Sequence, residues 1–159
     1  LPPIARLDTE DAIFHYLSGY TSKVSGTERG ITRPVAAFSA MFGAPFFPLR
    51  TEVYTKLVRE KLSRGDVRVF LVNTGWCGGY AGEVPRIKLS LTRSLVKAAI
   101  GGALDDAEYD RDELFRLNVP RSCPGIPDGV LSPQTYWADN DRYLREREHL
   151  AALFESSSA

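Results

Sequence analysis

The sequence is poor in the residues that build covalent or metal-held scaffolds. Its 159 residues include only two cysteines, Cys77 and Cys123, and two histidines, His15 and His149. Two cysteines are too few for a disulfide framework and lack metal-site spacing, so we expect ordinary reduced thiols. The histidines are far apart and each falls in a helical pattern, which favours a packing or surface role over catalysis.

An excess of one charge and a long apolar run are also missing. Twenty Lys and Arg residues balance twenty Asp and Glu residues, giving a net charge of zero. This balance gives no support for nucleic acid or an anionic membrane as the main partner. No apolar run approaches the roughly 20 residues that a transmembrane helix needs. We therefore expect a cytoplasmic protein that binds neither nucleic acid nor membrane.

What is present is the composition of an ordinary globular domain. Apolar residues make up 43% of the chain and charged residues 25%, close to the average for soluble proteins. The length suits one domain or part of a larger one. The chain begins at Leu1, with neither an initiating Met nor the charged region of a signal peptide, so we expect it to start within a longer sequence.

Four segments combine apolar residues at helical spacing with suitable cap residues. The last is capped by Asp139 or Asn140, and we expect its charged residues from Arg142 to Glu148 to be solvated. The predicted helices cover residues 9–20, the segment from Thr51 to Gly65, residues 92–100, and the segment from 139 or 140 to about 154.

The remaining segments predict few strands. The short apolar run at residues 67–72 predicts a buried strand, whereas residues 103–136 are expected to be extended or loop. Residues 35–49 are rich in aromatics, and Pro45 and Pro48 prevent one long helix there, so we expect an irregular segment buried in the core. Helices that alternate with strands indicate an α/β fold. The small number of strands suggests that they complete a sheet supplied by sequence outside the chain.

The segment best suited to a ligand is the glycine loop, residues 73–85, which follows the predicted strand. Its glycines let the backbone approach a ligand closely, and open α/β sheets bind ligands at such strand ends. A predicted short strand at residues 86–89 follows, with a guanidinium at Arg86 that can stack on a base. Thr92 offers a hydroxyl at a predicted helix start, near free backbone amides. The loop is neither a Walker A sequence nor a dinucleotide fingerprint, so a mobile surface loop and a ligand site both remain open.

The most specific feature is a series of residue blocks between Leu1 and about Phe154. The blocks are Leu1-Pro2-Pro3 with Leu7, His15-Tyr16-Leu17-Ser18-Gly19-Tyr20-Thr21, Gly26-Thr27-Glu28-Arg29-Gly30, Phe38-Ser39-Ala40-Met41-Phe42-Gly43, Asn73-Thr74-Gly75-Trp76, Arg86-Ile87-Lys88-Leu89 with Thr92-Arg93, and Pro127 with Leu131-Ser132-Pro133 and Trp137. In this order, they resemble the carboxy-terminal part of the ATP-dependent phosphoenolpyruvate carboxykinases. The chain departs from that family at Met41, where the family usually has Cys, and at Glu83-Val84-Pro85, where it usually has Gly and a polar or basic residue.

The resemblance implies a fold, a reaction and a set of binding residues. Residues 1–159 would be the carboxy-terminal part of a mononucleotide-binding domain, a mixed sheet with flanking helices that is incomplete on its own, with a frayed tail at 155–159. The family converts oxaloacetate and ATP to phosphoenolpyruvate, ADP and carbon dioxide in gluconeogenesis, with Mg²⁺ on the nucleotide and commonly Mn²⁺ in the site. Its adenine-nucleotide contacts fall on Arg86 as the stacking cation, Ile87 as an apolar and backbone contact, and Thr92 as a polar contact.

Other parts of the family's machinery are missing from this sequence. Neither its phosphate-binding Gly-Lys-Thr/Ser loop nor its metal-binding set of Lys, His and Asp occurs. The resemblance therefore implies that catalytic and metal-binding residues lie upstream of Leu1, and that the chain is inactive without that remainder of the enzyme. The alternative is a non-catalytic nucleotide-binding or protein-interaction module on the same scaffold.

Overall fold

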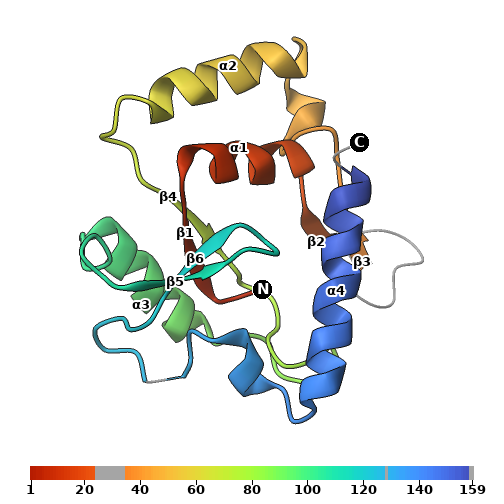
Figure 1. Cartoon of the computed structure of the whole chain (residues 1–159), viewed down its shortest axis with the longest axis vertical. Helices are drawn as coiled ribbons and strands as arrows, with labels where there is room; N and C mark the ends of the chain where they lie inside the picture. The colour runs from red at the N-terminus through yellow and green to blue at the C-terminus, as the bar shows by residue number, and fades with distance from the viewer. Residues whose placement is uncertain (24–34, 128, 158–159) are drawn as a thin grey trace. The chain divides into compact units, whose positions relative to one another are not determined.

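A computed structural model describes residues 1–23, 35–127 and 129–157. The chain divides into two compact units (Figure 1). The first comprises Leu1–Leu7 and Phe70–Arg147, and the second comprises Asp8–Val69 and Glu148–Ala159. Helix α4, Asn140–Ser157, contributes residues to both units.

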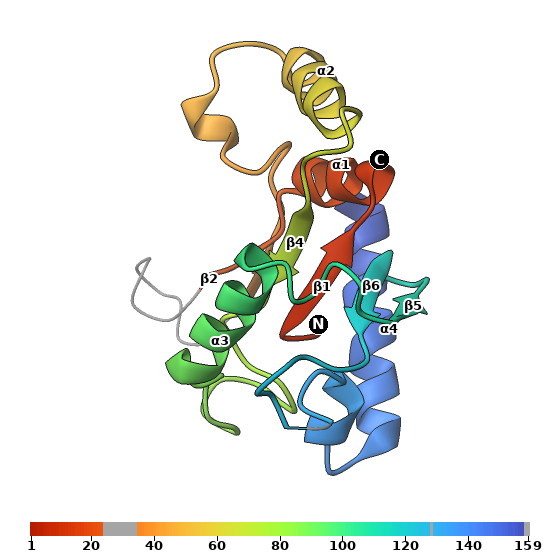
Figure 2. The same cartoon turned by 90° about the vertical axis from the view of Figure 1, so that its left-hand side faces the viewer.

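The first unit is built on a four-stranded sheet in the order β4-β1-β6-β5. Strand β6 pairs antiparallel with both β1 and β5 (Figure 2). The pairing with β1 places Arg6 opposite Asn118. Helix α3, Leu89–Ile100, supplies Leu95 to a core that also contains Ile4 and Leu104. The strands are β1, Ile4–Leu7; β4, Val69–Val72; β5, Tyr109–Asp112; and β6, Leu117–Pro120.

The second unit contains helices α1, Thr9–Ser18, and α2, Thr51–Leu62, which contact each other. A small antiparallel pair joins β2, Thr21–Lys23, to β3, Val35–Ala37. Aromatic side chains from three parts of the unit meet around the buried Phe154. Its ring centroid lies 6.0 Å from that of Phe14, 5.0 Å from that of Tyr20 and 5.1 Å from that of Phe38.

The α/β class and all four predicted helices are confirmed. Helix α1 ends at Gly19, whose φ of 54° is a left-handed conformation suited to glycine. The α4 cap is also confirmed, because the Asp139 carboxylate accepts a hydrogen bond from the Arg142 backbone N–H at 2.9 Å. In the described part of the chain, no helix is both long and apolar enough to cross a membrane.

The predicted strand at residues 86–89 is wrong. Helix α3 begins at Leu89 instead of Thr92, and residues 86–88 are an extended lead into it without strand pairing. The alternation of basic and apolar residues in Arg86-Ile87-Lys88-Leu89 imitates a strand. Leu91 precedes Leu95 by four residues and packs on the same core, so the helical spacing already begins before Thr92.

The prediction of a buried aromatic segment at residues 35–49 is wrong for much of its length. Phe38 packs on Phe154 and Met41 is buried, but Phe46 is 86% exposed and Phe42 is 58% exposed. The irregular backbone is confirmed, since its only helical turn is η1, Ala44–Phe46. The pattern showed that these side chains are apolar but not which surface would cover them.

Strand β4 is shorter and less buried than predicted. It begins at Val69, two residues after Val67, and its side chains are half-buried. Its place at one edge of the sheet explains this, because an edge strand is covered by fewer neighbours than an inner one. The β5–β6 hairpin was expected only as extended or loop structure, and the Asp112 carboxylate stabilises its turn by accepting the Leu114 and Phe115 N–H groups.

Candidate functional site

The glycine loop leaves the sheet directly after β4, where Asn73 fixes its start. The Asn73 backbone N–H donates to the Pro3 carbonyl at 3.0 Å, and its side-chain amide donates to the Leu1 carbonyl at 3.1 Å. The Asn73 side-chain oxygen accepts the Gly75 N–H at 2.8 Å. Asn73 therefore ties the loop to the segment before β1 and also shapes its first turn.

Arg86 and Ile87, at the far end of the loop, fold back onto its first residues. The Ile87 N–H donates to the Gly75 carbonyl at 2.8 Å, and Arg86 Nε donates to the Thr74 carbonyl at 2.6 Å. The guanidinium carbon of Arg86 lies 5.7 Å from the centroid of the Trp76 ring. Arg86 is exposed and Ile87 is half-buried. The two ends of the loop thus form one local surface.

Thr92 follows Ile87 in the same segment and lies in the first turn of α3. It is half-buried, and its backbone N–H donates to the Lys88 carbonyl at 3.1 Å. The predicted place near a helix start is confirmed, although the Thr92 amide is itself occupied. The structure therefore puts Arg86, Ile87 and Thr92 on one continuous stretch that runs from the loop into α3.

Gly78 is a point of close backbone approach within the loop. Its φ of 90° favours glycine, and a Cβ atom there would clash with the carbonyl of Tyr136, in η2, Pro133–Tyr136. The predicted exposure of the loop is thus only partly confirmed. Tyr80 and Glu83 are exposed, but Trp76 and Gly78 are half-buried.

The loop–helix cluster, which consists of Tyr80, Glu83, Arg142 and Glu146, connects the loop to α4. Arg142 Nη2 donates to Glu83 Oε2 at 2.8 Å, and the Tyr80 hydroxyl hydrogen-bonds to the Glu146 carboxylate. The guanidinium carbon of Arg142 lies 5.6 Å from the Tyr80 ring centroid and 5.5 Å from that of Trp137. Partial desolvation of the otherwise exposed Tyr80, reinforced by the hydrogen bond to Glu146, raises the pKa of Tyr80 to about 12.

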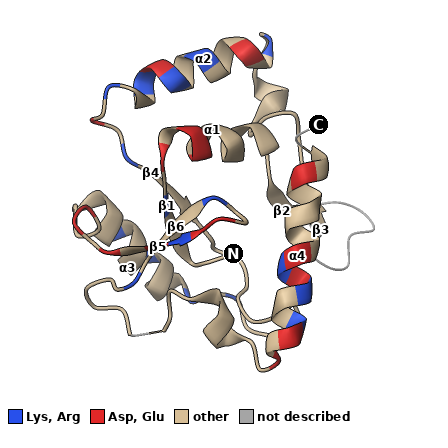
Figure 3. Ribbon diagram, viewed as in Figure 1, with Lys and Arg blue, Asp and Glu red and all other residues tan. Residues whose placement is uncertain are grey.

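Sequence reasoning missed this cluster. It predicted a solvated charged face on the last helix, and Figure 3 shows Arg, Asp and Glu residues crowded in the first half of α4. Two of those residues, Arg142 and Glu146, instead contact the loop. Arg142 lies 59 residues after Glu83, and the sequence around neither residue indicates that the two form a contact. Only the spacing of four between Arg142 and Glu146 indicates that they share a helix face.

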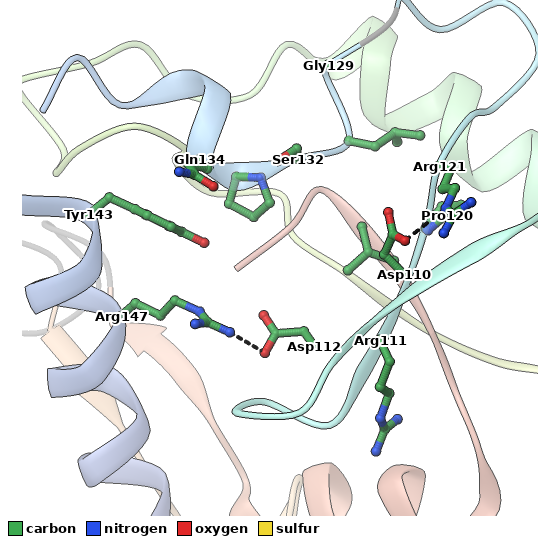
Figure 4. Close-up of a pocket in the computed structure, with 13 residues that line it drawn as sticks. Asp110, Arg111, Asp112, Pro120, Arg121, Gly129, Ser132, Gln134, Tyr143 and Arg147 are labelled. Atoms are coloured by element: carbon green, nitrogen blue, oxygen red, sulfur yellow. Dashed lines mark hydrogen bonds and ion pairs between the residues drawn. The ribbon is translucent and has the colours of Figure 1, made fainter. Parts of the chain in front are cut away.

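A cavity of about 300 Å³ lies elsewhere in the first unit, between the β5–β6 hairpin, residues 129–134 and α4. Its main charged groups are paired, with Arg147 Nη2 2.6 Å from Asp112 Oδ1 and Arg121 Nε 2.8 Å from Asp110 Oδ1 (Figure 4). The Arg147 Nε is buried without a hydrogen-bond partner. Arg86, Ile87 and Thr92 do not line this cavity.

The described residues contain no group of three or more His, Cys, Asp or Glu side chains that could hold a metal ion. His15 is buried, with its ring 5.2 Å from that of Phe14 and 5.6 Å from that of Phe154, as a packing role predicts. Burial raises the pKa of the Cys77 and Cys123 thiols. Both therefore stay protonated near neutral pH, which suits ordinary thiols.

The block Gly26-Thr27-Glu28-Arg29-Gly30 lies outside the described residues, so its predicted similarity is tested by sequence comparison alone. A family model described as phosphoenolpyruvate carboxykinase matches residues 1–129. Curated relatives named phosphoenolpyruvate carboxykinase (ATP) match almost the whole chain. The one from Caldanaerobacter subterraneus subsp. tengcongensis is 52% identical over 97% of this chain, that from Thermus thermophilus is 49% identical over 99%, and that from Bacillus subtilis is 48% identical over 99%. The chain spans about 30% of the length of each.

Proposed function

Because the chain belongs to the ATP-dependent phosphoenolpyruvate carboxykinase family, we propose that it forms the adenine side of the nucleotide site in such an enzyme. The complete enzyme would convert oxaloacetate and ATP to phosphoenolpyruvate, ADP and carbon dioxide, in the direction of gluconeogenesis. This chain would act together with the remaining sequence that its relatives possess.

One observation supports the binding role most strongly. The glycine loop closes on itself, so that the exposed Arg86 is held beside Thr74 and Trp76. The Thr74 carbonyl accepts a hydrogen bond from Nε, at one edge of the guanidinium. A planar cation that is held by one edge can still stack a face on a base. Adenine presents a large π surface to such a cation.

The neighbouring residues suit the other parts of an adenine site. Ile87 would provide an apolar contact and a backbone contact beside the base. Thr92 would provide a hydroxyl from the first turn of α3, where the helix dipole favours electron-rich groups.

The phosphoryl-transfer step needs groups that this chain does not provide. Bound Mg²⁺ and Mn²⁺ would neutralise phosphate charge in the complete enzyme. No metal-binding group in the described residues fits such ions, so the residues that hold them would lie in the remainder of the enzyme. Arg86, Ile87 and Thr92 would bind and orient the nucleotide.

The Arg86→Ala variant of the complete enzyme tests the binding role. Stacking and cation–π attraction contribute roughly 0.5–2 kcal/mol, so the KM for ATP should rise by about 2- to 30-fold. The kcat should change less, because adenine is remote from the reacting phosphate and is contacted similarly in ground and transition states. Arg86→Lys should restore only part, since an ammonium is not a flat stacking partner.

Arg64→Ala, which removes another exposed arginine, is the matched control and should leave the KM unchanged. If Arg86→Ala lowers the melting temperature but leaves the KM for ATP as it was, Arg86 is a structural residue and the assignment is wrong.

The isolated chain should show no carboxykinase turnover. Charge stabilisation of the transferring phosphoryl group supplies most of the catalysis in such reactions, and we assign those groups to the remainder of the enzyme. The assay uses the purified chain with oxaloacetate, ATP, Mg²⁺ and Mn²⁺. Metal-dependent product formation well above background would contradict the proposal.

A further inference from the structure

We propose that Arg142 is a positioning residue of the nucleotide site, which holds the glycine loop against α4 so that Arg86 is presented to adenine. The inference rests on the proposed function and adds to it a residue outside the Arg86–Thr92 segment. Arg142 would not touch the nucleotide. It would act through the loop–helix cluster.

Arg142 uses both the edge and the faces of its guanidinium. The edge donates to Glu83 at 2.8 Å, and the guanidinium carbon lies 5.6 Å from the Tyr80 ring centroid and 5.5 Å from that of Trp137. A guanidinium can hydrogen-bond in its plane and stack on aromatic rings at the same time, which an ammonium cannot do. Arg142 therefore connects two positions of the loop with the segment just before α4.

A second connection reinforces the first. Glu146 follows Arg142 by one helical turn, so both side chains project from the same face of α4. The Tyr80 hydroxyl hydrogen-bonds to the Glu146 carboxylate. Two residues earlier in the loop, Gly78 packs against the Tyr136 carbonyl. Gly78, Tyr80 and Glu83 thus hold successive points of the loop to η2 and α4.

The restraint is transmitted directly to Arg86. Glu83 precedes Arg86 by three residues, and Pro85 between them limits the backbone because its ring fixes φ. Arg86 and Ile87 then donate hydrogen bonds to the carbonyls of Thr74 and Gly75. Moving the Glu83 end of the loop away from α4 would therefore displace Arg86. ATP binding would then have to return the loop to its original conformation, which would weaken the affinity for ATP.

The test is Arg142→Gln in the complete enzyme. Each contact is partly exposed, with the Arg142 and Glu83 side chains 38% and 48% accessible, so each contributes little alone. The KM for ATP should rise by about 2- to 5-fold with a smaller change in kcat. Arg142→Lys should restore part of the affinity through its charge. Arg145→Gln, on an exposed site of the same helix, is the matched control and should have no effect.

Two further measurements separate positioning from a general loss of stability. Hydrogen exchange in residues 74–85 should accelerate in Arg142→Gln without ATP, while exchange in α3 stays unchanged. Glu83→Gln should raise the KM in the same direction but by no more than Arg142→Gln, and the double variant should be no worse than Arg142→Gln alone, because the contact with Glu83 is one of those that Arg142 makes.

The outcomes also separate this inference from the proposed function. If Arg86→Ala raises the KM for ATP but Arg142→Gln does not, the positioning role is overturned while the adenine assignment stands. Unchanged exchange in residues 74–85 of Arg142→Gln overturns the positioning role as well. If Arg86→Ala leaves the KM unchanged, the proposed function itself fails.

Discussion

Two arginines of the first unit use the same kind of contact. Arg86 donates to the Thr74 carbonyl beside the Trp76 ring, and Arg142 donates to Glu83 beside the Trp137 ring. In each, an edge hydrogen bond fixes the orientation of a planar cation next to an aromatic face. We therefore expect lysine to be a poor substitute at both positions.

Tyr80 should titrate late. Partial desolvation and the hydrogen bond to Glu146 raise its pKa to about 12, Glu83 adds to the increase, and Arg142 opposes it. Because the folded pKa is above the ordinary value near 10, the contribution of Tyr80 to stability is complete below about pH 10. It is lost as the pH rises toward about 12.

Phenolate absorbance measured against pH tests this behaviour, as the difference between the wild-type chain and Tyr80→Phe. The difference should appear near pH 12, and Glu146→Gln should shift it to lower pH. A difference that appears with a midpoint near pH 10 in the wild-type chain would show that Tyr80 is not held by Glu146.

At the scale of elements, the glycine loop depends on two glycines in different ways. Gly78 and Gly82 have nearly the same φ, 90° and 93°, but only Gly78 has a backbone carbonyl where a Cβ would stand. Gly78→Ala should therefore lower the melting temperature clearly more than Gly82→Ala, which introduces backbone strain alone. Thermal unfolding of both variants measures the difference, and equal losses would mean that the loop is not packed on Tyr136.

The elements also differ in how well the sequence predicts them. Helices were predictable because their signals are local, as at Asp139, which caps α4. Thr51 marks the start of α2 but not as its N-cap, which is Arg50 without a side-chain hydrogen bond. The β5–β6 hairpin gave little signal, since its strands are short and β5 is Tyr109-Asp110-Arg111-Asp112. Its pairing depends on contacts between segments, which residue type alone does not specify.

At the scale of the whole molecule, composition predicted more burial than this chain provides. Phe42, Phe46 and Leu49 are exposed in the second unit although their pattern is that of core residues. The chain spans about 30% of the length of its relatives.

The candidate site had a similar limit. Physical reasoning from the sequence identified a glycine-rich loop but left both a mobile surface loop and a ligand site open. The roles of Arg86, Ile87 and Thr92 came from the family resemblance, and remain predictions. Arg142 was missed as a contact of the loop, because it is recognised only when distant segments are placed together.

The most direct test of the central claim is nucleotide footprinting by hydrogen exchange on the complete enzyme. If this chain forms the adenine side of the site, ATP should slow amide exchange in residues 74–92, and Arg86→Ala should weaken that protection at the same ATP concentration. Exchange in α2 should not respond. Protection by ATP that leaves residues 74–92 unchanged would contradict the account.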